Sequence, residues 1–260
     1  MRNLRNTLLV SVVAIAAATG AHAADLYEPP IIEPLPIEPT FASAWYLRGY
    51  VGISNQKVDK IDNALYATAT SYTVEEKDFD ESYFVGGGVG YKMNDWFRFD
   101  VTGEYRGKSD FVGRDSWTFT DVDGTISGTN RFDGNKTEWL FLANAYVDLG
   151  TWHSITPYVG AGIGGARISM NDFTDTDEAG NVYRTDGDYS TWNFAWALHA
   201  GVAYDVSPNL AFEVGYRYVD MGDARSGDIL ALDGTNTVYN PLEFKDVTSH
   251  DVFFGIRYLM

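Results

Sequence analysis

Apolar and polar side chains alternate along most of the chain after residue 44. In residues 97–106, for example, Phe97, Phe99 and Val101 share one face and charged or hydroxyl side chains occupy the other. A period of two residues predicts a β-strand whose two faces meet different surroundings. The pattern predicts eight such strands, at residues 45–54, 82–92, 97–106, 138–149, 155–168, 191–205, 210–219 and 249–260.

The connections between these strands fall into two classes by length. The short ones are residues 93–96, 150–154 and 206–209, and the long ones are residues 55–81, 107–137, 169–190 and 220–248. Short turns join neighbouring strands as antiparallel hairpins. Because short and long connections alternate, the sequence predicts an up-and-down antiparallel sheet with its long loops at one end.

Two closed sheets fit this alternation: a soluble ligand-carrying barrel with its apolar face inward, and a membrane barrel with that face toward lipid. Strands of about ten residues match a tilted crossing of a bilayer. Aromatic residues near the strand ends, as at a membrane interface, are Trp45, Tyr83, Tyr91, Trp139, Trp192, Tyr204, Tyr218 and Tyr258. We therefore predict an all-β fold, an eight-stranded antiparallel up-and-down transmembrane β-barrel with four long external loops.

The N-terminus indicates export. Two arginines, an apolar run of about a dozen residues and an Ala-His-Ala site predict a signal peptide at residues 1–23, cleaved between Ala23 and Ala24. The alternative, a membrane anchor, needs roughly 20 apolar residues. Residues 24–43 hold five of the eight prolines and predict an extended, acidic periplasmic leader, with a docking peptide as the alternative. Residues 44–260 then form the barrel.

Charge and composition narrow the function. The chain has 36 acidic and 19 basic residues, a net charge of −17 and no cysteine. Such acidity disfavours nucleic acid as a partner, and the lack of cysteine excludes disulfides and thiolate chemistry. After removal of the signal, the long loops carry −13, the leader −4 and the strands with their short turns −2. The acidity therefore belongs to the parts in water, and the barrel wall is nearly neutral.

Charged residues recur on the polar faces of the strands, where they would fill the lumen. This predicted lumen charge network consists of Arg48, Arg98, Asp100, Glu104, Arg106, Glu138, Glu213, Arg217, Asp251 and Arg257. A gated or narrow polar channel is one interpretation. A salt-bridged plug is the other, and it is favoured because eight strands leave room for little beyond side chains.

No catalytic, cofactor or metal site is expected. Of the three histidines after the signal, His153 lies in a short turn, His199 is expected to pair with a carboxylate in the lumen, and His250 points away from its neighbour Asp251. The acidic loop 169–190 matches calcium-loop spacing poorly. It either holds divalent cations between lipopolysaccharide phosphates or is simply solvated.

The chain resembles small eight-stranded outer-membrane barrels of the porin-family type, which include opacity-type adhesins, the OmpA membrane domain and alphaproteobacterial surface antigens. The segments that carry the resemblance are residues 45–53, 84–91, 157–164 and 251–260. The resemblance implies a C-terminal insertion signal for the barrel-assembly machinery, with alternate apolar residues and a terminal aromatic. The matching residues are Val252, Phe254, Ile256 and Tyr258, and Met260 departs from the pattern.

Together these features predict a structural, surface-exposed protein of the Gram-negative outer membrane that supports membrane integrity and cell-surface interactions. Its expected partners are outer-membrane lipid, lipopolysaccharide, the assembly machinery, and host or surface ligands bound by the loops. A small-solute porin, an adhesin or haem-binding protein, and a lipid-modifying enzyme are the alternatives.

Overall fold

The computed structural model describes residues 44–260. The predicted signal peptide, the cleavage site at Ala23 and Ala24 and the proline-rich leader lie outside the described residues. Within residues 44–260, no helix is long and apolar enough to cross a membrane.

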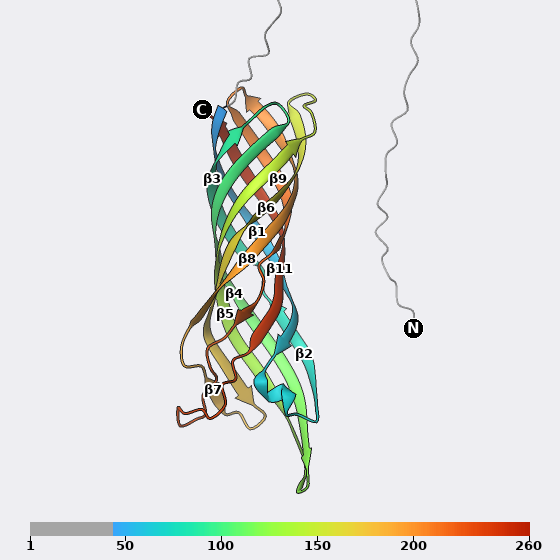
Figure 1. The fold of residues 1–260 in the computed structure, drawn as a ribbon, viewed down its shortest axis with the longest axis vertical. Coiled ribbons are helices and arrows are strands. Elements are labelled where there is room, and N and C mark those ends of the chain that lie inside the picture. The colour runs from blue at the N-terminus through green and yellow to red at the C-terminus, as the bar shows by residue number, and fades with distance from the viewer. Residues whose placement is uncertain (1–43) are drawn as a thin grey trace, which may run out of the picture. The chain divides into compact units, whose positions relative to one another are not determined.

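Eight strands form a closed antiparallel ring, as the alternation of side chains predicts (Figure 1). They are β1 (Ala44–Asp62), β3 (Ser82–Lys92), β4 (Phe97–Asp121), β5 (Gly124–Asp148), β6 (Ile155–Asp177), β8 (Tyr189–Ser207), β9 (Leu210–Asp220) and β11 (Glu243–Leu259). Each pairs with the next along the chain, and β1 pairs with β11 to close the ring. Closure leaves the barrel wall without an unpaired edge.

Connections of two lengths lie at opposite ends of the barrel (Figure 1). The three short connections, residues 93–96, 149–154 and 208–209, are at the end where β1 starts and β11 finishes. The four long segments are at the other end, which we call the external end. The predicted separation of short turns and long segments is therefore confirmed.

Much of the external end is strand rather than loop. Strands β4 and β5 continue past the expected boundary and pair without interruption from Ser109–Lys136 to Asp121–Gly124, so residues 107–137 are a long hairpin. The remaining short elements are β2 (Ser71–Phe79) against β4, β7 (Val182–Arg184) against β6, β10 (Ala224–Arg225) against β11, and the 3-10 helix η1 (Ala64–Ala67). Apolar and polar residues alternate less regularly at the external end, because most of the strand segments there have water on both faces.

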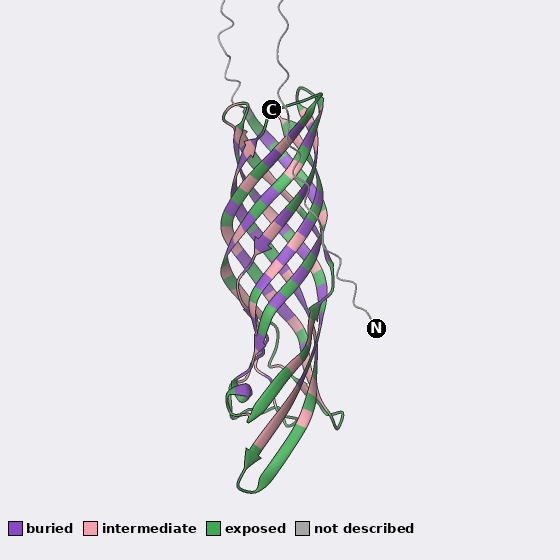
Figure 2. Ribbon diagram, turned by 90° about the vertical axis from the view of Figure 1, so that its right-hand side faces the viewer, coloured by how far each residue is buried: buried purple, intermediate pink, exposed green. Residues whose placement is uncertain are grey.

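The outer face of the wall is apolar. Figure 2 shows buried and exposed residues alternating along the barrel strands. Large apolar residues are exposed on the outside, among them the predicted interfacial residues Trp45, Tyr83, Trp139, Trp192, Tyr204 and Tyr258. This belt of exposed apolar surface is what a lipid-facing wall requires.

The interior is partly charged and partly apolar. Charged and tyrosine side chains fill much of it. An apolar cluster lies beside them, includes Leu140 and Leu142 of β5 between the buried polar residues Glu138 and Asn144, and extends toward the external end into an aromatic group. The aromatic group consists of Phe79, Phe111, Phe132, Phe173 and Phe244. The prediction that the polar face fills the lumen therefore holds only in part, because apolar side chains also fill it.

Glycines on the inner face make room for tyrosines. Tyr46 of β1 lies over Gly90 of β3, its cross-strand neighbour, and a Cβ at Gly90 would overlap the Tyr46 ring. Tyr146 covers Gly160 in the same way. The glycines of the polar faces are therefore close-packing positions, not flexible ones.

Candidate functional site

All ten residues of the predicted lumen charge network lie inside the barrel. Nine are buried, and the side chain of Arg257 is 14% exposed near the short-turn end. They come from β1, β4, β5, β9 and β11, which the closed sheet brings around one interior. The structure therefore places the whole predicted set in one interior.

Two arginines and two carboxylates form the centre of this network. Arg106 Nη2 lies 2.6 Å from Asp251 Oδ2, and Arg106 Nε lies 2.8 Å from Glu104 Oε1. Arg217 Nη2 contacts the same two carboxylates, at 2.8 Å from Glu104 Oε2 and 2.7 Å from Asp251 Oδ2. Each charge therefore has two opposite partners, an arrangement that offsets the cost of removing it from water.

A second centre lies closer to the short turns. Glu213 meets three guanidinium groups, with Oε1 at 2.9 Å from Arg257 Nη1 and 3.7 Å from Arg98 Nη1, and Oε2 at 3.2 Å from Arg48 Nη2. Arg48 Nη1 in turn lies 3.1 Å from Asp100 Oδ2. Among residues 44–260 no ion pair joins the two centres, so the paired charges form two separate groups inside one barrel.

The sequence reasoning missed two charged members and the aromatic ones. Lys136 pairs with Glu138 and with Gln56, and Asp148 Oδ1 lies 3.0 Å from Arg98 Nε. With these two, the buried network has six cations and six carboxylates. Lys136 falls in a segment predicted as loop, so its inward position could be recognised only once β5 was known to begin earlier.

Tyrosine rings separate the guanidinium groups. The Arg98 guanidinium lies 4.2 Å from the ring centroid of Tyr146 and 4.6 Å from that of Tyr158. Arg48 Nη1 lies 2.6 Å from Tyr146 Oη. Such cation–π and hydrogen-bond contacts hold like charges apart in a crowded interior.

The three histidines of residues 44–260 do not form a catalytic arrangement with the groups around them. His199 is buried, but its Nε2 lies 3.1 Å from the amide oxygen Oδ1 of Asn144, so the expected carboxylate partner is wrong. His250 Nδ1 lies 2.6 Å from Tyr216 Oη on the outer side, while Asp251 points inward. His153 is exposed in the turn before β6. The opposite directions of His250 and Asp251 agree with the prediction.

The alternate residues of the C-terminal strand face outward, as an insertion signal requires. The outward set, each member between 43% and 60% exposed, is Val252, Phe254, Ile256, Tyr258 and Met260.

The acidic segment 169–190 is mostly a hairpin. Strand β6 continues to Asp177 and pairs with β7, so the carboxylates do not wrap around one point. Among residues 44–260, no three His, Asp or Glu side chains are grouped so that they could hold a metal ion.

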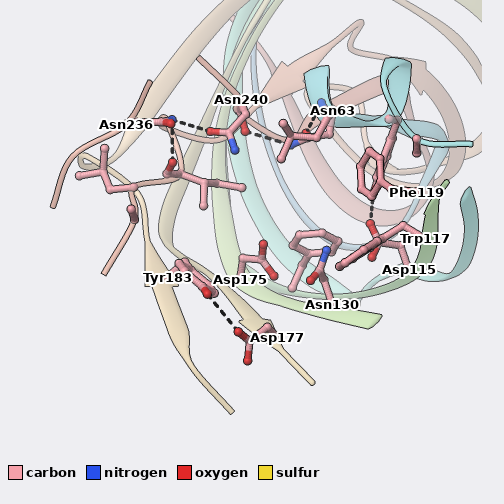
Figure 3. A pocket seen from close by; sticks show the side chains of 17 residues that line it. Asn63, Asp115, Trp117, Phe119, Asn130, Asp175, Asp177, Tyr183, Asn236 and Asn240 are labelled. Carbon is pink, nitrogen blue, oxygen red and sulfur yellow. Dashed lines mark hydrogen bonds between the residues drawn. The ribbon is translucent and has the colours of Figure 1, made fainter. Parts of the chain in front are cut away.

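A cavity of about 360 Å³ opens at the external end, beyond the aromatic cluster as seen from the barrel. Its lining comes from η1, β4, β5, β6, β7 and the segment between β10 and β11. Figure 3 shows Asp115, Asp175 and Asp177 on the strand side, with Asn236 and Asn240 on the side of the β10–β11 segment. Sequence reasoning did not predict this cavity.

Two carboxyl groups that line the cavity have raised pKa values. Burial, followed by the charges of the neighbouring Asp115 and Asp177, raises the pKa of Asp175 to about 7. Burial also raises the pKa of Asp115, although the Tyr66 hydroxyl donates a hydrogen bond to its Oδ2. Both shifts indicate carboxyl groups held in partly dry surroundings.

Comparison with known proteins agrees with the barrel. Residues 8–250 match the family model described as the outer membrane protein beta-barrel domain. An uncharacterised protein of Brucella abortus is 31% identical, with 94% of each chain covered. The 25 kDa outer-membrane immunogenic protein of Brucella abortus is 26% identical, over 95% of this chain and 96% of the relative. Outer membrane protein PagN of Salmonella typhimurium is 28% identical, over 66% of this chain and 72% of the relative.

The family match covers nearly the whole chain, and the strand order, the apolar outer wall and the filled interior fit it. The ring of strands is a transmembrane barrel of the outer membrane, and the chain belongs to the outer membrane protein beta-barrel domain family.

Proposed function

We propose that this protein is a closed outer-membrane barrel that contributes to membrane integrity and presents a binding surface at its external end. The observation that carries this proposal is the filled interior. A conducting pore needs a continuous water-filled path lined by polar groups. Here paired charges, tyrosine side chains and the apolar cluster together fill the lumen.

The packing of the charged network supports a plug rather than a channel. The space left between Arg48, Tyr50, Tyr146, His199 and Arg217 has no room for a water molecule. Arg106 and Glu213, at the two centres, are completely buried. The narrow-porin alternative would need these pairs to separate, which leaves buried charges without partners.

The external end is the part available to other molecules. Its paired strands give the cavity and the surrounding surface a fixed shape, which a binding surface needs. A relative is named as an immunogenic outer-membrane protein, which supports surface exposure. We further propose lipid and lipopolysaccharide around the wall, the assembly machinery during insertion, and no enzymatic activity.

Planar-bilayer recording tests the closed barrel. The refolded protein should give no reproducible current steps at low protein load. The double variant Arg106→Ala, Arg217→Ala, checked for folding by its heat-dependent gel mobility, should give steps because it empties the centre of the plug. Reproducible unitary steps from the unaltered protein would overturn the proposal.

A deletion strain tests the two roles separately. The full barrel and a barrel with its four external segments replaced by short turns should both restore resistance to detergent and retention of periplasmic enzymes. Only the full barrel should restore binding of the cells to surfaces coated with extracellular-matrix protein. Equal surface binding by the trimmed barrel would contradict a binding role for the external end.

A further inference from the structure

The external cavity combines acidic groups with aromatic and aliphatic walls. Its volume, about 360 Å³, is within the range of small-molecule sites, about 300–1,000 Å³. Most of the lining is apolar, with wall residues such as Leu65, Trp117 and Ile229. The three charged residues of the lining are Asp115, Asp175 and Asp177, and the described lining holds no lysine, arginine or histidine.

Asp115 is the strongest indication of a missing ligand. The residue is completely buried, and its Oδ2 accepts a hydrogen bond from Tyr66. Its Oδ1 is also buried but has no hydrogen-bond partner within residues 44–260. A buried carboxylate oxygen without a donor is costly. The cavity that Asp115 lines is therefore short of a donor at this oxygen.

Asp175, two strands further on in the sheet, also has a buried oxygen without a hydrogen-bond donor: its Oδ1 has no partner among the described residues. The ladder of β4, β5 and β6 aligns Asp115 with Asn130 and Asn130 with Asp177, two residues from Asp175. Two carboxyl groups, one on β4 and one on β6, thus line one cavity, and each has an oxygen without a hydrogen-bond donor in the described part of the chain.

The aromatic walls suit a cation with an organic body. Trp117 and Phe119 lie together on β4, with ring centroids 5.2 Å apart. Tyr66 stacks on Tyr72 with a centroid separation of 4.3 Å and an angle of 9° between the rings, so its position is fixed. Aromatic faces attract ammonium and guanidinium groups and also cover apolar surface.

We propose that this cavity binds a small organic cation, with its ammonium or guanidinium group donating to Asp115 and Asp175 and its apolar body against Trp117 and Phe119. The inference rests on the proposed function, because it assigns a ligand class to the external binding surface. An anionic or sulfated ligand would meet like charge here. A bare divalent cation would lack ligands, because it needs six or more oxygens and the walls are largely apolar.

The charges around Asp175 make binding depend on pH. Its neighbours with titratable groups are Asp115 on β4, Asp177 on β6, Tyr66 on η1 and Tyr183 on β7. The lining residues of β5 and of the β10–β11 segment are uncharged. Since burial raises the pKa of Asp175 to about 7, a cation meets the ionised carboxylate above that pH. Affinity should therefore fall as the pH is lowered from 8 to 6.

Titration calorimetry on the refolded full-length barrel in detergent tests the proposal. The probe is 2-phenylethylamine, which is protonated at pH 8, and the matched neutral probe is 2-phenylethanol. Loss of a hydrogen bond to a charged group costs about 1.5–3 kcal/mol, so the alcohol should bind at least about tenfold more weakly. Asp115→Asn should weaken amine binding by a similar factor.

The control variant is Asp59→Asn, at an exposed carboxylate on β1 outside the cavity, and it should leave binding unchanged. Trp117→Leu provides a second cavity variant if Asp115→Asn fails to refold, and it should also weaken amine binding. Equal binding of amine and alcohol, or unchanged amine affinity in both cavity variants, would overturn the inference.

The outcome is separable from that of the proposed function. Absence of amine binding with silent bilayers would overturn this inference and leave the closed, integrity-supporting barrel in place. Amine-dependent current through the unaltered barrel would overturn both, because the cation would then be a permeant solute.

Discussion

Arg106 and Asp251 join strands that are not neighbours in the barrel wall. Arg106 Nη2 of β4 lies 2.6 Å from Asp251 Oδ2 of β11, and the strands β1 and β3 lie between them in the ring. The pair therefore spans the interior. It ties together parts of the wall that share no backbone hydrogen bonds.

Removing one member of this pair should be strongly destabilising. Arg106→Met leaves Asp251 and Glu104 with only Arg217 as a close cation, and breaking a buried pair costs about 3–5 kcal/mol. The control is Arg131→Met, which removes an exposed pair with Asp133 and should cost about 0–1 kcal/mol. Urea unfolding in lipid vesicles measures both, and equal losses would show that the network does not hold the barrel together.

The aromatic cluster should stabilise the external end. Phe111 is 1% exposed, and its ring centroid lies 4.9 Å from those of both Phe79 and Phe244. Phe111→Ala should cost about 3–5 kcal/mol through lost contacts and a cavity. Hydrogen exchange should quicken at β2 and at the outer part of β11.

Ile126→Ala, at a 65% exposed position on the same hairpin, is the control for that variant and should change neither quantity. Unchanged exchange in Phe111→Ala would mean that the external strands are held by their backbone ladders alone.

Two glycines give a matched test of close packing. Gly90→Ala should destabilise the barrel by about 1–3 kcal/mol, because the new methyl group displaces the Tyr46 ring. Gly49→Ala lies on the outer face with no atom within 4 Å of the new Cβ and should be neutral. Unfolding free energy and the heat-dependent shift in gel mobility measure the difference. A neutral Gly90→Ala would contradict the packing role given to the inner glycines.

Asp175 should make stability depend on pH. Its pKa is raised from 3.8 to about 7 in the folded protein, so the folded state prefers the protonated form. The wild type therefore loses stability as the pH rises from about 4 through 7, and Asp175→Asn removes this loss. At about 1.4 kcal/mol per pKa unit, the variant should be about 2–4 kcal/mol more stable at pH 8 and equal to wild type at pH 4.

Unfolding free energies at pH 4, 6 and 8, without added amine, check this expectation. Asp59→Asn serves as the exposed control and should track the wild type at every pH. A constant difference between Asp175→Asn and wild type across this range would assign its effect to packing instead of charge.

The sequence predicts the barrel wall well because each wall strand separates two different media. Trp45, Leu47 and Val51 are exposed as expected, while Tyr46 and Arg48 are buried. The ten network residues followed from the same rule, since a charge on the polar face of a lipid-bounded strand must lie inside.

The external end could not be predicted in this way. Phe111 and Phe132 are core residues in a segment whose average composition is polar, so no periodic signal separates them from loop residues. The contact of Tyr66 with Asp115 joins residues 49 positions apart through the packing of η1 on β4. Such contacts depend on how non-repetitive segments fold over the barrel, which residue alternation does not encode.

Strand β11 has two roles in the barrel: it closes the ring by pairing with β1, and it carries a carboxylate of the lumen charge network. That carboxylate belongs to Asp251, and both Arg106 and Arg217 pair with it. Without β11 the sheet would have an open edge, and both arginines would lose one of their carboxylate partners. Unpaired backbone groups and incompletely paired charges are both strongly disfavoured in hydrocarbon. Closure of the backbone ladder and full pairing of the interior arginines therefore depend on the same strand, so an unclosed barrel is disfavoured on both counts inside the bilayer.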